Sequence, residues 1–159
     1  MSIFTVESKQ GNLVENLYET LIYVMRASAA KRKNIYGASV SAYEPYYEMI
    51  QVKEAFEQMN GKGYLHYTLD PDPFDVLMVD NFFMIGRVIA EKISHFYGTY
   101  QVLMAIHFDA QQYHMHFIAN NIDYIDSKLD EETKKAFNFI KSDMKKIIEK
   151  ALYIATTNG

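Results

Sequence analysis

The chain has 159 residues, a length that fits one domain with a sizeable hydrophobic core. Hydrophobic residues make up 49% of it, which excludes a disordered composition, and the absence of cysteine excludes disulfides and thiolate metal sites. The net charge of −4 argues against the broad basic surface that is typical of large nucleic-acid footprints.

The first elements in chain order are a short strand and a long helix. The alternation in Ser2–Val6 predicts a strand, and the Gln-Gly-Asn sequence that follows breaks it. Asn12 and Glu15 have the spacing of a capping box, which predicts a helix over Leu13–Ala30. We therefore expect a helix to follow the first strand directly.

Tyr23 stands apart on this predicted helix. At about 100° per residue it lies opposite the apolar stripe, on the side of Glu15 and Glu19, whereas Tyr18 lies on the stripe and is expected in the core. The stripe consists of Leu13, Val14, Leu17, Tyr18, Leu21, Ile22 and Met25. Tyr23 is therefore expected to keep its hydroxyl free.

The remaining elements complete a mixed pattern. A basic and then Gly-, Ser- and Tyr-rich stretch over 31–47 indicates an irregular connection, in which Pro45 limits any helix. Short connections between neighbouring strands predict an α+β fold, with a central sheet that is antiparallel at least in part and helices packed on it. The expected elements are helices over 46–60, 76–97 and 130–154, and strands over 64–69, 100–109 and 113–120.

The organisation of the chain is simple. It contains no internal repeat and no interdomain linker, so we expect a single domain over residues 1–159. No apolar run approaches the roughly 20 residues of a membrane span, and the first residues do not resemble a signal peptide. The expected location is the cytoplasm.

Three of the five histidines lie within ten residues, in the sequence HFDAQQYHMH. His114 and His116 are two apart on a predicted strand and share a face, as do His107 and Asp109 on the preceding strand. If the hairpin folds back, three imidazoles converge in the manner of a catalytic metal site. Asp109 or another acceptor would then orient one ring, although surface histidines on an ordinary hairpin remain the alternative.

The segment HFDAQQYHMHFIANN resembles the histidine motif of the mobilisation relaxases, His-x-Asp-x4-His-x-His followed by apolar residues and Asn. His107, Asp109, His114, His116 and Asn120 fall on the matching positions, and Gln112 stands where many members have a further histidine. Upstream, GYLHYTL is similar to a family strand but has Asp70 at a usual Ser position. The resemblance covers about residues 3–125.

The resemblance implies a chemistry for these residues. Tyr23, in a segment similar to the family's N-terminal helix, would be the nucleophile that forms a 5′-phosphotyrosine with single-stranded DNA at a transfer origin. His107, His114 and His116 would hold Mg²⁺ or Mn²⁺, with Asp109 and Asn120 supporting them; three imidazoles also suit Zn²⁺. Accessory relaxosome proteins are possible partners.

The basic cluster Lys31, Arg32 and Lys33 has two interpretations. It contacts DNA phosphates, or it is a solvated helix end where cations favour the helix dipole. Two further functions stay open for the chain: a relaxase-like binding or accessory protein that does not cut DNA, and a three-histidine hydrolase of a small substrate in which Tyr23 has no role. The net charge and Asp70 favour the first of these two alternatives.

Overall fold

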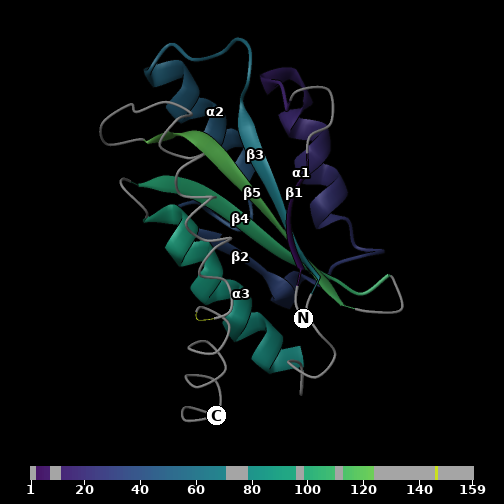
Figure 1. Cartoon of the computed structure of the whole chain (residues 1–159). Helices are drawn as coiled ribbons and strands as arrows, with labels where there is room; N and C mark the ends of the chain where they lie inside the picture. The colour runs from purple at the N-terminus through teal and green to yellow at the C-terminus, as the bar shows by residue number, and fades with distance from the viewer. Residues whose placement is uncertain are drawn as a thin grey trace.

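The computed structural model describes residues 3–7, 12–70, 79–95, 99–109, 113–123 and 146. These residues form one five-stranded sheet with the order β1-β3-β5-β4-β2, in which every neighbouring pair is antiparallel. The predicted α+β fold with an antiparallel-containing sheet is confirmed, and the described sheet is antiparallel throughout (Figure 1). The strands are β1 (Ile3–Glu7), β2 (Ile35–Ala38), β3 (Tyr64–Asp70), β4 (Tyr100–His107) and β5 (His114–Asp123).

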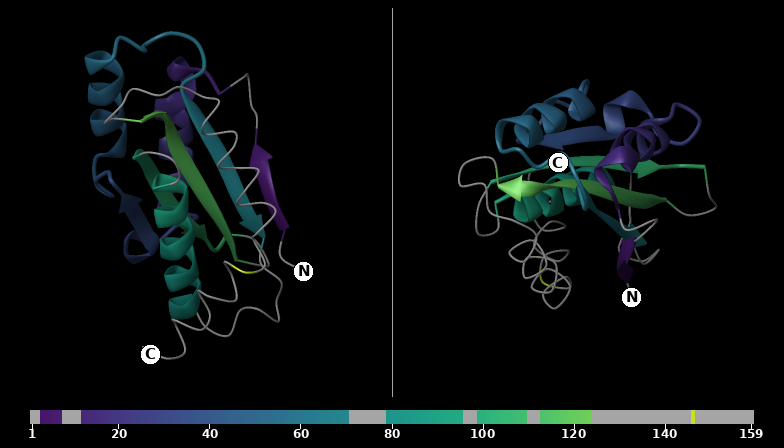
Figure 2. Two further views of the ribbon diagram at one scale, coloured as in Figure 1. Left: turned by 60° about the vertical axis from the view of Figure 1, so that its left-hand side comes forward. Right: turned by 90° about the horizontal axis from the view of Figure 1, so that it is seen from above.

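Helices cover both faces of the sheet. The helices α1 (Leu17–Met25) and α2 (Pro45–Ala55) lie on one face and α3 (Val79–Ser94) lies on the other, as the view from above in Figure 2 shows. Residues of β4 and β5 therefore alternate between two cores. Leu103, Ala105 and Ile118 pack against α1, whereas the residues between them pack against α3. The central strands are thus buried on both sides, which explains the continuous apolar runs over 102–106 in β4 and 117–119 in β5.

The first helix is shorter than the sequence predicts. A 3-10 turn over Val14–Asn16 leads into α1, which ends at Met25 instead of Ala30. The Ala-Ser-Ala-Ala stretch has good helix propensity, but Ala29 is buried and its carbonyl accepts a hydrogen bond from the Phe108 amide at 2.8 Å. This tertiary contact at the end of β4 outweighs the local preference.

The stretch over 31–47 was predicted to be irregular, but it contains the edge strand β2. Ile35–Ala38 pairs with β4 in the register Ile35↔Ala105. The strand has only four residues and includes Gly37, so its own composition gives little strand signal. A β-carbon on Gly37 would stand 2.0 Å from the Val40 carbonyl oxygen, so the tight return of the chain requires glycine there.

The second helix also ends before its predicted boundary. α2 stops at Ala55 because Glu57 takes a left-handed conformation with φ of 55°, and the Gln58 amide donates to the Lys53 carbonyl in a Schellman arrangement. The predicted helix over 76–97 is α3, of which the structure describes Val79–Ser94. The predicted tail helix over 130–154 lies outside the described residues, apart from Lys146.

Candidate active site

The three clustered histidines come from the two central strands. Antiparallel pairing of β4 with β5 places His107 directly opposite His114, and His116 is on the same face two residues further along β5. One ring nitrogen from each histidine lies within 4.8 Å of the corresponding atoms of the other two. His107 and His116 are buried beneath α1, and His114 is partly exposed. The hairpin brings the three imidazoles together, as the spacing in the sequence indicates.

Two buried nitrogen atoms of this cluster have no hydrogen-bond partner among the described residues. They are Nδ1 of His107 and Nε2 of His116. The Nε2 atom of His107 lies 2.7 Å from the Val24 carbonyl oxygen, which only accepts, so His107 carries its proton on Nε2 and a lone pair on Nδ1. Buried polar atoms without a partner are rare. A divalent ion among the three rings would satisfy both, so this donor set fits a metal.

Val24 connects the histidines to the first helix. Its carbonyl is among the last of α1, where carbonyl groups have no partner within the helix. The hydrogen bond from His107 supplies that partner. The same bond sets the tautomer of His107 and holds the end of α1 over the sheet, so the helix and the cluster position each other.

His66 is a fourth histidine of the site. It lies on β3, and its Nε2 is 2.7 Å from Nδ1 of His116. Coordination of a metal by Nε2 of His116 requires the proton on Nδ1, which then donates to His66. The sequence shows His66 as a single histidine in an apolar strand, and only the pairing of β3 with β5 assigns this contact. The fifth histidine, His95, pairs instead with Glu91 on α3.

The environment keeps His107 and His116 neutral. Burial, together with the neighbouring imidazoles and the Arg26 guanidinium, lowers the pKa of His116 to about 2. Burial also lowers the pKa of His107, with smaller contributions of the same sign from His114 and Arg26. Since metal ligands must be deprotonated, these two imidazoles are ready to bind an ion at neutral pH.

Tyr23 stands beside the cluster. Its ring centroid lies 6.1 Å from that of His107 and 6.4 Å from that of His116, and the side chain is 48% exposed. It is thus off the buried face of α1, as predicted. The companion prediction for Tyr18 is wrong, because Tyr18 is 53% exposed and packs edge-on against Tyr46. The buried face of α1 consists of Leu17, Leu21 and Val24, and it is narrower than the predicted apolar stripe.

Arg26 and Asp109 form an ion pair at the edge of the cluster. The guanidinium of Arg26 lies 4.0 Å from the Tyr23 ring centroid, and it donates to the Tyr23 carbonyl oxygen and to Asp109 Oδ2, both at 2.6 Å. The structure therefore pairs Asp109 with Arg26, whereas Val24 and His66 orient the histidine rings. Arg26 follows Tyr23 by three residues, the spacing of neighbours on a helix surface, and this signal was available in the sequence.

Asn120 does not lie at the histidine cluster. It is four residues beyond His116 on β5, about 13 Å along the strand. Its amide donates to the Met49 carbonyl at 3.2 Å and to Gln101 Oε1 at 2.9 Å beneath α2. The expectation that Asn120 supports the histidines is corrected: the matching sequence position serves packing between β5 and α2.

The basic cluster is exposed, but it does not follow the end of α1 directly. Lys31 precedes the 3-10 turn Arg32–Asn34, and the helix has ended six residues earlier. The Arg32 guanidinium stacks on the Tyr43 ring at 3.9 Å, and the Lys31 ammonium lies 6.0 Å from the Phe108 ring centroid. The helix-dipole interpretation is therefore excluded, because dipole effects fall off within the last turn.

A family model described as "Relaxase: MobA/VirD2-like, nuclease domain" matches residues 23–151, well over half of the chain. The matched range begins at Tyr23 and includes all three clustered histidines. The match supports a metal-dependent, DNA-acting nuclease role. No curated protein matches the chain. Among the described residues, no helix is both long and apolar enough to cross a membrane.

Proposed function

The chain belongs to the MobA/VirD2-like relaxase nuclease family, and on that premise we propose that it nicks and transfers one DNA strand through a covalent phosphotyrosine at Tyr23. The strand would be cut at a transfer origin, which starts mobilisation of a plasmid or an integrative element. The observation that carries the proposal is the position of Tyr23, whose exposed ring stands beside His107 and His116 at 6.1 and 6.4 Å. We propose that residues 1–159 act as a single nuclease domain.

The reaction proposed for Tyr23 is a transesterification. The phenol oxygen attacks the scissile phosphorus and loses its proton, and the bond from phosphorus to the 3′ oxygen breaks. The products are a 5′-phosphotyrosine and a free 3′-hydroxyl, so the phosphodiester energy is conserved and the strand can be rejoined. A phenol is a weak nucleophile at neutral pH and needs activation. Arg26, stacked on the Tyr23 ring, brings a positive charge to the place where negative charge develops.

The three histidines are the residues that would hold the metal, which we propose is Mg²⁺ or Mn²⁺. Nδ1 of His107 and Nε2 of His116 are the buried atoms without a partner, and His114 completes the set. Three imidazoles also suit Zn²⁺. The ion would neutralise charge on the scissile phosphate as a Lewis acid. His66 and the Val24 carbonyl fix the rings of His116 and His107 before an ion binds.

Phosphate contacts away from the cut are assigned to Lys31, Arg32 and Lys33. All three are exposed, and the chain that carries them returns past the end of β4, where Ala29 and Phe108 are bonded. Contacts of this kind position a strand without reading its sequence. Arg26 lies between Tyr23 and this basic stretch in the chain, and its guanidinium is paired with Asp109.

The test is a covalent-adduct assay. The protein is mixed with Mn²⁺ and single-stranded oligonucleotides from the transfer origin of its own element, or a pool of them, and a DNA-linked band is sought on a denaturing gel. Tyr23→Phe is expected to abolish the adduct while DNA binding remains. Tyr113→Phe is the matched control, since Tyr113 is an exposed tyrosine that packs on Phe82 and Phe108.

Each alternative function has its own outcome in this assay. No adduct from a wild-type protein that binds both Mn²⁺ and the oligonucleotides would refute nicking and leave a binding protein. Hydrolysis of a small substrate that persists in Tyr23→Phe and disappears in His114→Ala would instead indicate a three-histidine hydrolase. An adduct that is lost in both variants would support the strand transferase.

A further inference from the structure

Three consecutive residues at the end of β4 hold α1 and the turn that follows it. The His107 ring and the Phe108 amide are bonded to backbone carbonyls of this segment, at 2.7 and 2.8 Å. Asp109, the third residue, accepts a hydrogen bond from Arg26 at 2.6 Å. His107 is buried, whereas the side chains of Arg26 and Asp109 are 28% and 34% exposed. The first two contacts therefore fix the helix on the sheet, and the third lies at the surface, where its partner can change.

The Arg26 guanidinium has two contacts that do not depend on Asp109. Its Nη1 donates to the Tyr23 carbonyl oxygen at 2.6 Å, and its central carbon lies 4.0 Å from the centroid of the Tyr23 ring. The bond to Asp109 uses the other terminal nitrogen, Nη2. The guanidinium is thus held over the proposed nucleophile by the backbone and the ring, and only its Nη2 side is open to exchange.

The ligand that suits this open side is an anion. A guanidinium presents its N–H groups in a fork that matches the oxygens of a carboxylate or a phosphate. An exposed ion pair such as Arg26–Asp109 contributes little, because water solvates both charges well. A phosphate that approaches the Tyr23 hydroxyl comes close to Arg26, which is stacked on the same ring. The carboxylate of Asp109 and that phosphate therefore compete for one cation.

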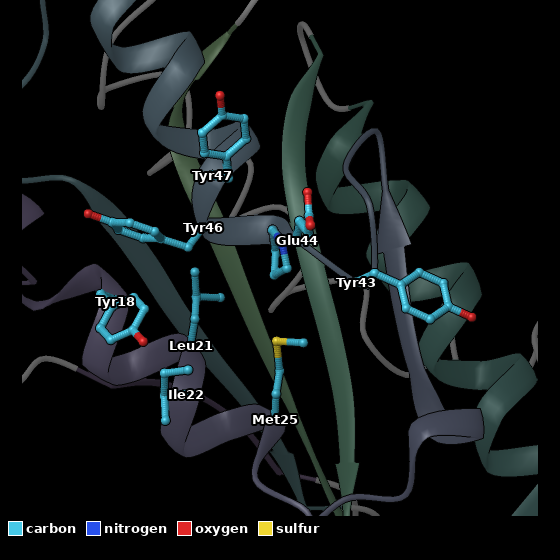
Figure 3. A pocket seen from close by; sticks show the side chains of 9 residues that line it. Tyr18, Leu21, Ile22, Met25, Tyr43, Glu44, Tyr46 and Tyr47 are labelled. Atoms are coloured by element: carbon cyan, nitrogen blue, oxygen red, sulfur yellow. The ribbon is translucent and has the colours of Figure 1, made fainter.

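The other arginine that is stacked on an exposed tyrosine has different surroundings. Arg32 lies 3.9 Å from the Tyr43 ring centroid and donates to the Ala42 carbonyl oxygen. Tyr43 lines an apolar groove between α1 and the start of α2, to which Tyr18 and Ile22 also contribute, and Figure 3 shows its ring pointing away from Ile22. Within the described part of the chain, no carboxylate pairs with Arg32. Arg32 is therefore a matched arginine without an internal anion.

We propose that Asp109 occupies, in the DNA-free protein, the position on Arg26 that a backbone phosphate of the cut strand takes when DNA binds. Asp109 is then an internal competitor of DNA, and Arg26 passes from the carboxylate to the phosphate without leaving the Tyr23 ring. The inference deepens the proposed strand transfer and rests on it for the identity of the anion as a DNA phosphate. Phosphate contacts carry no sequence information, so a homopolymer is a suitable probe.

The experiment measures the Kd for fluorescent oligo-dT by anisotropy, with Mn²⁺ present and in a Tyr23→Phe background. That background keeps the ring beneath Arg26 and has no hydroxyl with which to form a phosphotyrosine. Asp109→Asn is expected to lower the Kd about two- to fivefold, the effect of removing a competitor as strong as an exposed ion pair. Asp109→Glu keeps a carboxylate and should bind like the background protein.

The gain in affinity must depend on Arg26. In combination with Arg26→Ala, Asp109→Asn should lower the Kd no more than Glu19→Gln does. Glu19 is an exposed carboxylate one turn of α1 before Tyr23, so its removal reports the effect of one negative charge alone. In combination with Arg32→Ala, Asp109→Asn should keep its full gain, because Arg32 has no part in the exchange.

Three outcomes would overturn the proposal. An unchanged or higher Kd in Asp109→Asn would mean that the pair only holds Arg26 in place. A gain of the same size in the Arg26→Ala background, or an equal gain from Glu19→Gln, would mean that Asp109 repels DNA as one negative charge among others. Misfolding cannot imitate the expected result, since it weakens binding, and Asp109→Ala provides a second variant that should gain affinity in the same way.

The adduct assay separates this proposal from the proposed function. If Asp109→Asn binds oligo-dT more tightly through Arg26 and the wild type forms no adduct, the exchange stands and nicking is refuted. If the wild type forms adducts and Asp109→Asn has an unchanged Kd, nicking stands and the exchange is refuted.

Discussion

Acid should destabilise the metal-free protein through His116, because the buried ring cannot accept a proton in the folded state. The pKa of His116 is lowered from 6.5 to about 2 by burial, with the neighbouring imidazoles and Arg26 acting in the same direction. Between these values the unfolded chain binds a proton at His116 and the folded chain does not. Stability therefore rises with pH through this window and is lost as the pH falls from about 6.5.

The size of this loss follows from the shift. At pH 5, which is about 1.5 pH units below the pKa of His116 in the unfolded chain, protonation of the unfolded chain lowers the free energy of unfolding. The loss is about 1.5 times 1.36 kcal/mol, or about 2 kcal/mol, for His116 alone. The measurement is urea unfolding at pH 7 and pH 5 in the presence of a chelator. The decline between the two pH values should be about 2 kcal/mol smaller in His116→Asn, and it should be unchanged in His95→Asn, an exposed histidine on α3. Equal declines in the wild type and His116→Asn would refute the reasoning.

Two further predictions concern residues that act beside the ligands and the nucleophile. His66→Ala removes the partner of Nδ1 of His116 and should weaken Mn²⁺ binding about 10- to 100-fold in a calorimetric titration. His66→Gln should lose less affinity, because its amide oxygen still accepts the hydrogen bond. Equal affinity in the wild type and His66→Ala would contradict the orienting role of His66. Arg26→Ala removes the cation over the Tyr23 ring and should slow single-turnover adduct formation at least about tenfold. Asp109→Asn, which changes only the partner of Arg26, should have a smaller effect. An unchanged rate in Arg26→Ala would exclude a role for this charge.

The histidine site was largely visible in the sequence because strand geometry is local. Alternation along a strand places His114 and His116 on one face, and a short connection to the preceding strand brings His107 opposite them. Tyr23 was separable from the buried face of its helix by the same kind of argument, since helical periodicity also depends only on neighbouring residues. The α+β class follows from the order of these periodic segments.

Other features depend on contacts between segments that are distant in the chain. His66 is 50 residues from its partner His116, and nothing in its own strand indicates that contact. The length of α1 is decided by the bond between Phe108 and Ala29, and β2 exists because β4 offers it an edge. Local propensity is worth less than a kilocalorie or so per residue, so such contacts outweigh it.

The sequence by itself determined the two central strands, the face that their histidines share and the helix that carries Tyr23, because each is set by a repeat of two or 3.6 residues. Only the tertiary structure decided which groups complete the site. It pairs Asp109 with Arg26, places Asn120 under α2 and leaves Tyr18 and Ile22 in an open groove. The physical reason is that periodicity determines which side of its element a residue faces, whereas the docking of α1 and α2 on the sheet determines which groups that residue contacts.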